Sequence, residues 1–313
     1  MQFHKEILPQ LPRALKIISP SAAAVFRKKL DALYDQLNQS RFIHPDPLEA
    51  ALKFPEAGDR EIAAFLSAMF ALGRVDLILQ TLDTLFTHLP NPRKMLLELD
   101  PDNIPRQLMG IIPPMKYRFF SYARILLLIS SMAVVIQKFG SLQQAAAPVP
   151  GESEEAVYPG LAAAMNLRYA LERGAEDQIR RFPELFQGED GIPGIIVPEV
   201  KPPFHRSGAA KRMMLFLRWM VRRDEVDPGG WNILSPADLL YPLDTHMMRV
   251  TAELGLRSRK SADMSTVIEI TDNFRIINSE DPVKYDFALT RTGIHPETRS
   301  LHRAESFWKD IIS

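Results

Sequence analysis

The amino-acid sequence predicts an almost entirely α-helical protein. Apolar residues recur at helical spacing through most of the 313 residues, whereas the strict alternation of apolar and polar residues that marks strands is hard to find. Hydrophobic residues make up 46% of the chain and charged residues 24%, which are ordinary proportions for a chain that folds around a core. We therefore expect one large helical domain or two closely packed helical parts.

Several stretches carry a clear helical pattern, and some begin with capping residues. In the first half these stretches are 21–37, 59–72, 75–89 and 117–139, and in the second half they are 153–173, 175–186, 208–223, 245–254, 262–277 and 282–291. Asp281 and Pro282 are expected to serve as the cap and the first-turn proline of the last helix.

The stretch 144–152, QAAAPVPGE, is the best linker in the sequence. It is small, contains proline and glycine, and leads into an acidic run that suits a helix start. We therefore expect an N-terminal helical part, residues 1–150, and a C-terminal helical part, residues 151–313, with a cleft between them. A second irregular stretch, 188–203, is rich in proline and leads directly into the most informative part of the chain.

The composition excludes several kinds of chemistry and limits others. The chain has no cysteine, which excludes disulfides, cysteine-ligated metals and thiol nucleophiles, and its seven histidines are scattered, so we expect neither a metal nor a cofactor. Its 38 basic residues balance 38 acidic ones, so contact with nucleic acid needs a local patch. The apolar run 125–136 is short of the roughly 20 residues that span a bilayer. Pro9 and Pro12 interrupt any secretion signal, and we expect a cytoplasmic protein.

One local basic segment stands out, residues 201–223, which contain seven lysines and arginines and no acidic residue. On a helix that starts near Gly208, Lys211, Arg218 and Arg222 share one face, and such a face suits contact with phosphates. The alternative is a solvated helix face with acidic neighbours from other helices. The residues expected to contact DNA are Ser207, Gly208, Arg212, Arg218 and Arg222.

A second feature follows in the segment YPLDTHMMRV, where Asp244 precedes a helical pattern. Asp244 is expected to be an N-cap, because its carboxylate can accept the unpaired amides of the next turn. That role alone explains the residue structurally. The same position also holds a carboxylate rigidly at a helix start, directed at whatever lies beside the preceding basic helix.

These two segments together resemble the helix-hairpin-helix DNA glycosylases. The resemblance lies in Ser207-Gly208-Ala209-Ala210-Lys211 followed by Leu243-Asp244-Thr245-His246, and in Phe65–Met69, which is similar to the L-L-S-A-Q stretch of an early helix in those enzymes. The long separation of the lysine from the aspartate is most similar to the archaeal 8-oxoguanine DNA glycosylase branch. Over nearly the whole chain, the segments 211–224, 242–246 and 281–296 resemble a bacterial family of unassigned function, the domain-of-unknown-function 2400 family.

The glycosylase resemblance implies a base-excision enzyme that acts on damaged, oxidised bases in duplex DNA. The target nucleotide would be flipped into a pocket, and Lys211 would attack the sugar at C1′ to form a Schiff base while Asp244 stabilises the positive sugar. A lysine attacks only when neutral, so burial or neighbours such as Arg212 and Arg218 would have to lower its pKa. One departure is Ala209, which stands where these enzymes have a second hairpin glycine, and it weakens the expected phosphate contact.

Three further residues are weaker site candidates. Trp231, in the loop segment DPGGWNIL, is expected to line a pocket, and His246 and Tyr285 are expected to support it. A histidine beside a helix start is also explained by structural hydrogen bonding, and a late amphipathic helix also explains Tyr285. Trp219, on the basic helix, is expected in the core.

Two other functions stay open beside the enzyme. The chain can be a nucleic-acid-binding protein that has lost catalysis, or a helical scaffold in which Lys211 and Asp244 form a structural ion pair. The fold alone does not choose among these functions. The discriminating observation is spatial: whether the amine and the carboxylate face one opening within a few ångströms, with the arginines around them.

Overall fold

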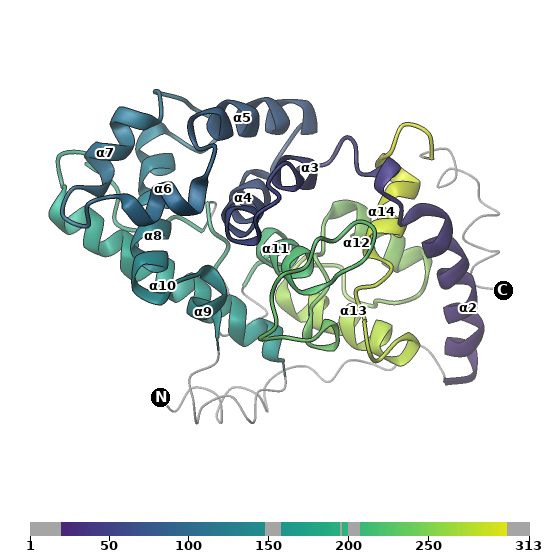
Figure 1. Cartoon of the computed structure of the whole chain (residues 1–313). Helices are drawn as coiled ribbons and strands as arrows, with labels where there is room; N and C mark the ends of the chain where they lie inside the picture. The colour runs from purple at the N-terminus through teal and green to yellow at the C-terminus, as the bar shows by residue number, and fades with distance from the viewer. Residues whose placement is uncertain (1–19, 148–157, 195, 200–206, 299–313) are drawn as a thin grey trace, which may run out of the picture. The chain divides into compact units, whose positions relative to one another are not determined.

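A computed structural model describes residues 20–147, 158–194, 196–199 and 207–298, with no side-chain detail for residues 20–22. These residues form helices and connecting segments, and no β-strand occurs among them, so the predicted all-α class is confirmed (Figure 1). Strand-like pairing among the described residues is limited to isolated bridges, such as the one between Gly208 and Asp263.

The chain divides into two compact units that interleave in sequence. Unit 1 lies within residues 1–45, 151–161 and 200–313, and unit 2 lies within 46–150 and 162–199. Each unit thus takes residues from both sides of the predicted linker, which differs from the expectation of two consecutive parts. The reason is that the first described helix packs against the last two helices of the chain.

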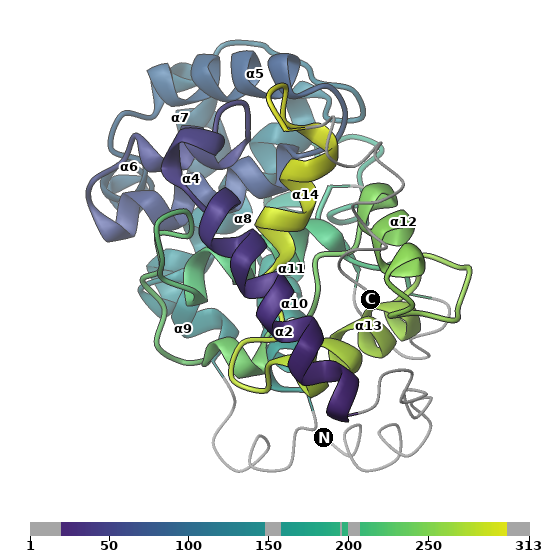
Figure 2. The same ribbon diagram turned by 90° about the vertical axis from the view of Figure 1, so that its right-hand side faces the viewer.

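The described part of unit 1 contains five α-helices that belong wholly to it, and it carries most of the predicted site residues. They are α2 (Pro20–Leu37), α11 (Lys211–Val221), α12 (Thr245–Glu253), α13 (Met264–Ile277) and α14 (Asp286–Ile294). Helix α2 lies against α13 and α14 (Figure 2). The largest fully buried side chains of this unit include Trp219, Phe216 and Phe274, so its core forms around α11 and α13.

Unit 2 is built mainly from α4, α8 and residues 162–181 of α10. Its helices are α3 (Leu48–Leu52), α4 (Ala57–Phe70), α5 (Val75–His88), α6 (Pro92–Glu98), α7 (Ile104–Ile111), α8 (Tyr122–Phe139), α9 (Leu142–Ala146) and α10 (Pro159–Arg181). The predicted helix pattern at Phe65–Met69 forms the fully buried second half of α4. Burial in the core is therefore enough to explain the apolar residues of this stretch.

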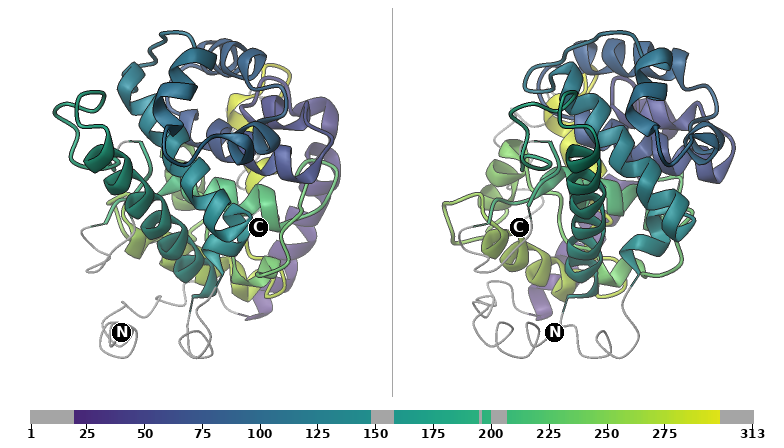
Figure 3. Two further views of the ribbon diagram at one scale, coloured as in Figure 1. Left: turned by 60° about the vertical axis from the view of Figure 1, so that its left-hand side comes forward. Right: turned by 90° about the vertical axis from the view of Figure 1, so that its left-hand side faces the viewer.

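Helix α10 is one continuous helix where the sequence predicts two. The expected break falls at Gly174, but this residue remains helical, within the long α10 that Figure 3 shows as one continuous helix. A Cβ atom at Gly174 would lie 3.0 Å from the carbonyl oxygen of Ser131, so the glycine allows α10 and α8 to approach closely. The glycine therefore marks a helix contact, not a helix end.

Other helix boundaries also differ from the prediction. Helix α8 starts at Tyr122, because Ser121 caps it by accepting the amide of Arg124 at 3.2 Å. Helix α14 starts at Asp286, four residues later than Pro282, since residues 282–285 form turns. The short helices α3, α6, α7 and α9 were not expected, because they span too few turns for a helical pattern to show.

Helix α8 is long and apolar enough, by length and composition, to cross a membrane. However, 61% of its apolar window is buried inside the protein, which is the environment of a core helix. The predicted absence of a transmembrane segment is consistent with this burial.

Candidate functional site

The starts of two helices bring Lys211 and Asp244 together. Lys211 is the first residue of α11, and Asp244 caps α12 by accepting the amide of Met247 at 2.8 Å. The Nζ atom of Lys211 lies 3.2 Å from Oδ2 of Asp244, and the two side chains are 34% and 25% exposed. The two side chains therefore form an ion pair that is accessible to solvent.

The residue before Lys211 has an unusual backbone. Ala210 adopts a left-handed conformation with φ of 46°, which is uncommon for a residue with a Cβ atom. Its carbonyl accepts the amides of Met213 and Met214, and its side chain is buried. This conformation turns the chain sharply into α11 and presents Lys211 at the first helical position, at a cost of the order of 1 kcal/mol.

The segment leading into α11 is attached to the start of α13. The carbonyl of Ser207 accepts the amide of Met264 at 3.1 Å, and Gly208 forms a backbone bridge with Asp263. Gly208 is exposed, and no atom lies within 4 Å of the position that a Cβ atom would take, so a ligand can approach its backbone. Residues 201–206 of the basic segment lie outside the described residues.

The prediction that Arg218 and Arg222 form an exposed face for DNA is wrong. Both residues are only 3% exposed. Arg218 donates from Nε and Nη2 to Oδ1 of Asp227 at 3.2 and 2.9 Å, and it also binds Asp286. Arg222 likewise binds carboxylates in the interior. Because a buried guanidinium requires anionic partners, these side chains are part of the core.

Four carboxylates complete this buried network around the two arginines. The partners of Arg222 include Asp227, Asp224 at 2.9 Å and Asp281 at 2.9 Å. Asp227 itself is fully buried and bridges both arginines. We call the set Arg218, Arg222, Asp224, Asp227, Asp281 and Asp286 the buried ion network.

Asp286 couples this network to the lysine–aspartate pair. Complete burial raises its pKa to about 6 from the ordinary 3.8, although the positive charge of Arg218 opposes the shift. The negative charge of Asp244 raises the pKa further, and the positive charge of Lys211 lowers it. The charges of Lys211 and Asp244 therefore influence the pKa of Asp286, although Asp286 itself is buried in the core.

Arg212, another predicted DNA contact, is also an interior residue. It is 7% exposed, and burial lowers the pKa of its guanidinium to about 10 from 12.5, so it stays charged at neutral pH. The expectation that Arg212 contacts phosphate directly is therefore wrong. Its position in the first turn of α11 still adds positive charge near Lys211.

His246 lies in the first turn of α12 and packs on the backbone of Gly293 in α14. Its Nε2 atom is 3.4 Å from the carbonyl oxygen of Leu289. A Cβ atom at Gly293 would lie 1.8 Å from Cε1 of His246, so the imidazole occupies the space left by the missing side chain. Burial lowers the pKa of His246, which keeps the ring neutral at neutral pH. His246 therefore anchors the helix start that presents Asp244.

Trp231 and Tyr285 pack in the core instead of lining an open pocket. Trp231 is 7% exposed, meets Phe216 edge to face at 5.2 Å, and donates its backbone amide to Met220 at 2.8 Å. Tyr285 is fully buried, and its hydroxyl donates to Asp31 at 2.9 Å. Trp219, at 1% exposure, is in the core as predicted.

The sequence interpretation missed the acidic half of the buried ion network. Asp224 and Asp227 follow the basic helix directly, in RRDEVDPGG, whereas Asp281 precedes the last helix and Asp286 is its first residue. The available signal was the close succession of arginines and aspartates at residues 222–227. Gly293 was missed as well, because a single glycine near a helix end also suggests a cap.

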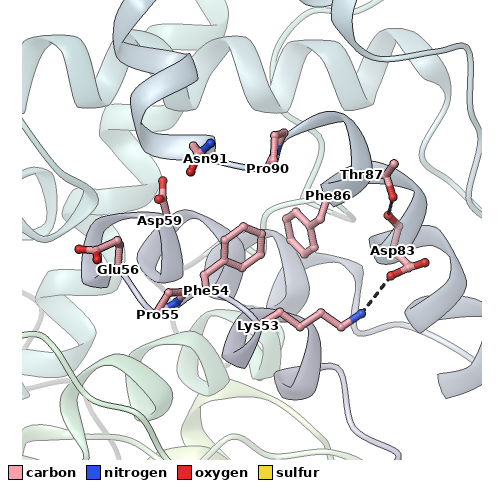
Figure 4. Close-up of a pocket in the computed structure, with 10 residues that line it drawn as sticks. All are labelled: Lys53, Phe54, Pro55, Glu56, Asp59, Asp83, Phe86, Thr87, Pro90 and Asn91. Atoms are coloured by element: carbon pink, nitrogen blue, oxygen red, sulfur yellow. Dashed lines mark hydrogen bonds and ion pairs between the residues drawn. The ribbon is translucent and has the colours of Figure 1, made fainter.

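A pocket of about 320 Å³ lies in unit 2, away in sequence from the predicted site residues (Figure 4). It is lined by Lys53, Phe54, Pro55, Glu56, Asp59, Asp83, Phe86, Thr87, Pro90 and Asn91. Lys53 pairs with Asp83 at 2.9 Å, and Asp59 accepts the amide of Arg93 at 2.7 Å. These carboxylates thus already have partners. Among the described residues, no three histidines or carboxylates are placed to hold a metal ion.

The fold and the site together define an all-α protein with an accessible lysine–aspartate pair at two helix starts. The family described as "Protein of unknown function (DUF2400)" matches residues 46–295, and the chain belongs to this family. The matched region contains Lys211, Asp244 and the entire buried ion network, whereas α2 precedes it. Comparisons with curated proteins and with solved structures found no match.

Proposed function

We propose that this protein is a DNA base-excision glycosylase with lyase activity, acting on damaged, oxidised bases through Lys211 and Asp244. The observation that carries the proposal is the 3.2 Å contact between the Lys211 amine and the Asp244 carboxylate, in which both groups remain partly exposed. The resemblance of the two segments to helix-hairpin-helix glycosylases supports the choice of reaction. The helix-hairpin-helix arrangement and the cleft between two subdomains stay predictions, as does a cytoplasmic location.

The pair supplies the two groups that this reaction requires. Once Lys211 has lost its proton to the solvent to which it is partly exposed, its nitrogen forms a bond to C1′ of the flipped nucleotide, and the bond from C1′ to the base breaks with its electron pair leaving on the base. Opening of the sugar ring then gives an imine between Lys211 and C1′. The Asp244 carboxylate stabilises the positive charge that develops on the sugar and holds the amine in place.

The protein environment makes the carboxylate suitable for this role. Asp244 caps α12, so its position is fixed by a backbone amide as well as by Lys211. His246 on Gly293 fixes the same helix start from the other side. A carboxylate held at one place before the charge develops stabilises that charge without a cost of reorganisation.

The second candidate function is a nucleic-acid-binding or structural helical protein without catalysis. The burial of Arg212, Arg218 and Arg222 favours its structural form, because the predicted phosphate-binding face is absent. In that case the contact between Lys211 and Asp244 is a surface ion pair, which contributes little to stability.

Borohydride trapping on damaged duplexes tests the proposal. The wild-type protein should form a covalent adduct with a duplex that contains an abasic site, 8-oxoguanine or an oxidised pyrimidine, because borohydride reduces the imine to a stable amine. Lys211→Gln should abolish the adduct. Asp244→Asn should suppress base release by at least about a hundredfold while the helix stays capped, since asparagine also caps well.

Lys53→Gln is the matched control, because Lys53 also pairs with an aspartate but lies in unit 2. It should trap like the wild type. If the wild-type protein yields no adduct and releases no base from any of these duplexes, the glycosylase proposal is wrong and the second candidate stands.

A further inference from the structure

A basic loop joins α12 to α13 and was not among the expected DNA contacts. Residues 256–262, LRSRKSA, contain Arg257, Arg259 and Lys260 and no acidic residue. Lys260 is exposed and forms no ion pair with any residue that the structure describes. Figure 2 shows the connection running from the end of α12 to the start of α13. The segment therefore carries positive charge to the surface of unit 1.

Two carboxylates give this loop a fixed backbone. Glu269, only 4% exposed, accepts the amide and the hydroxyl of Ser258 at 2.9 and 2.5 Å, and the amide of Arg259 at 3.3 Å. Asp263 accepts Nη2 of Arg259 at 2.9 Å and the hydroxyl of Ser261 at 2.5 Å. Burial alone would raise the pKa of Asp263, but these hydrogen bonds lower it, so this support stays anionic.

The charge of Arg257 is not cancelled by an acidic partner. Its Nε atom donates to the carbonyl of Met248 at 2.7 Å, and its Nη1 atom donates to the carbonyl of Arg259. Both acceptors are neutral, and Arg257 forms no ion pair with a described residue. Arg257 thus holds two backbone carbonyls of the loop and its neighbouring helix, and no described carboxylate pairs with it.

Backbone contacts connect the basic loop to the segment that presents Lys211. Asp263, which directly follows the loop, forms a bridge with Gly208, and Met264 donates its amide to Ser207. Lys211 follows three residues after Gly208 on the chain. The loop, the open backbone of Gly208 and the reactive pair therefore belong to one connected part of unit 1.

We propose that the basic loop 256–262 binds backbone phosphates of the duplex whose damaged nucleotide reaches Lys211. The inference rests on the proposed function and deepens it, by assigning to this loop the role that Arg218 and Arg222 do not fill. An exposed lysine on a fixed loop suits this role, because binding to phosphate releases counterions from the duplex and breaks no ion pair that the described residues form. Phosphate contacts of this kind position the duplex without reading its sequence.

Equilibrium binding to an undamaged fluorescent duplex over a series of salt concentrations tests this assignment. Lys260→Glu should weaken binding by roughly tenfold at low salt and reduce the salt slope by about one, because one phosphate contact is lost. Lys116→Glu is the control: Lys116 is also exposed, has no ion pair with a described residue, and lies in unit 2. It makes the same charge change and should bind like the wild type. Thermal unfolding of both variants should match the wild type.

The outcomes distinguish the phosphate-binding role of the loop from the catalytic role of Lys211 and Asp244. Weaker binding by Lys260→Glu in a protein that gives no borohydride adduct would support the loop and reject the catalytic proposal. Adduct formation with equal binding by Lys260→Glu and Lys116→Glu would reject the loop and support the catalysis. The assignment is also overturned if the wild type binds no duplex at low salt, or if anionic lipid vesicles, and not DNA, bind in a manner that depends on Lys260.

Discussion

The two ends of α11 place their basic side chains in opposite surroundings. At the start of the helix, Lys211 meets one carboxylate, and the pair is 34% and 25% exposed. Toward its end, Arg218 and Arg222 are each 3% exposed and share Asp227 between them. Both ends contain ion pairs, yet the pair at the first end is the more accessible to a ligand. The accessible end is therefore the reactive candidate, and the buried end is its support.

The difference follows from the cost of removing charge from water. A buried guanidinium is tolerated only when carboxylates and hydrogen bonds compensate for lost hydration, and each group left without its partner is then strongly destabilising. An accessible pair carries no such constraint, because water can replace either partner. The same helix can thus be fixed at one end and free for chemistry at the other.

The largest expected effect comes from breaking the buried end. Asp227→Asn removes the charge that both arginines share and leaves the shape of the side chain nearly unchanged. We expect a loss of about 3–5 kcal/mol in the free energy of unfolding, the range seen when one partner of a buried ion pair is removed. Urea unfolding followed by circular dichroism measures it.

Asp76→Asn is the control for Asp227→Asn. Asp76 pairs with Arg74 at 2.5 Å, but the two side chains are 58% and 75% exposed, so the free energy of unfolding should stay nearly unchanged. Equal stability of both variants would mean that the buried ion network does not stabilise the fold, and the contrast between the two ends of α11 would lose its basis.

The second prediction concerns the contact that holds the start of α12. Gly293→Ala places a methyl group where the ring of His246 lies, so either the ring or the helix must move. We expect a loss of about 1–3 kcal/mol, the usual range for overpacking. Gly110→Ala is the matched control, because Gly110 is also helical and has nothing within 4 Å of its Cβ position; it should be neutral or slightly stabilising.

A double variant separates the ring from other causes in the Gly293 experiment. In Gly293→Ala combined with His246→Ala, the methyl group no longer meets the imidazole, so the added cost of the glycine change should largely disappear. If the double variant instead shows the full sum of both losses, His246 does not anchor the helix start as described.

The third prediction concerns the titration of Asp286, which interacts with Arg218 near the end of α11 and with Lys211 at its start. Its pKa in the folded protein is raised to about 6 by burial, above the ordinary 3.8. Between these values the folded protein retains a proton that the unfolded chain has lost, so the free energy of unfolding falls as pH rises through this window. The slope reaches at most about 1.4 kcal/mol per pH unit. Because asparagine does not titrate, the free energy of unfolding of Asp286→Asn, measured with urea, should fall less steeply between pH 3.8 and about 6 than that of the wild type. Parallel pH profiles of the two proteins would contradict the prediction.

Much of the fold could be predicted from the sequence, because helical spacing and caps act locally. The N-cap role of Asp244 was expected, since a capping residue leaves a direct signal, whereas its contact with Lys211 was suggested only by the glycosylase resemblance. The position of α2 against the last helices leaves no such signal, because it depends on contacts between distant residues. The burial of Arg218 and Arg222 was not predicted either: spacing places side chains on a shared face but does not say what covers that face.

The smallest expected effect on stability comes from the accessible end of α11. Lys211→Gln should change the free energy of unfolding by less than about 0.5 kcal/mol, because a partly exposed pair contributes little. Asp244→Asn should be similarly mild, since asparagine caps a helix, whereas Asp244→Ala should lose about 1 kcal/mol with the cap. Thermal unfolding of the three variants measures this order.

These small values matter because they decide how a loss of activity is understood. If Lys211→Gln keeps the wild-type stability and abolishes borohydride trapping, the amine acts in the chemistry and not in the fold. If Asp244→Asn unfolds the protein, the carboxylate is required for more than its cap and its ion pair, and the scaffold function is favoured. Removal of the Lys211–Asp244 pair is expected to cost almost no stability, because other residues hold the two helix starts in place. These are the properties expected of a ligand-binding site.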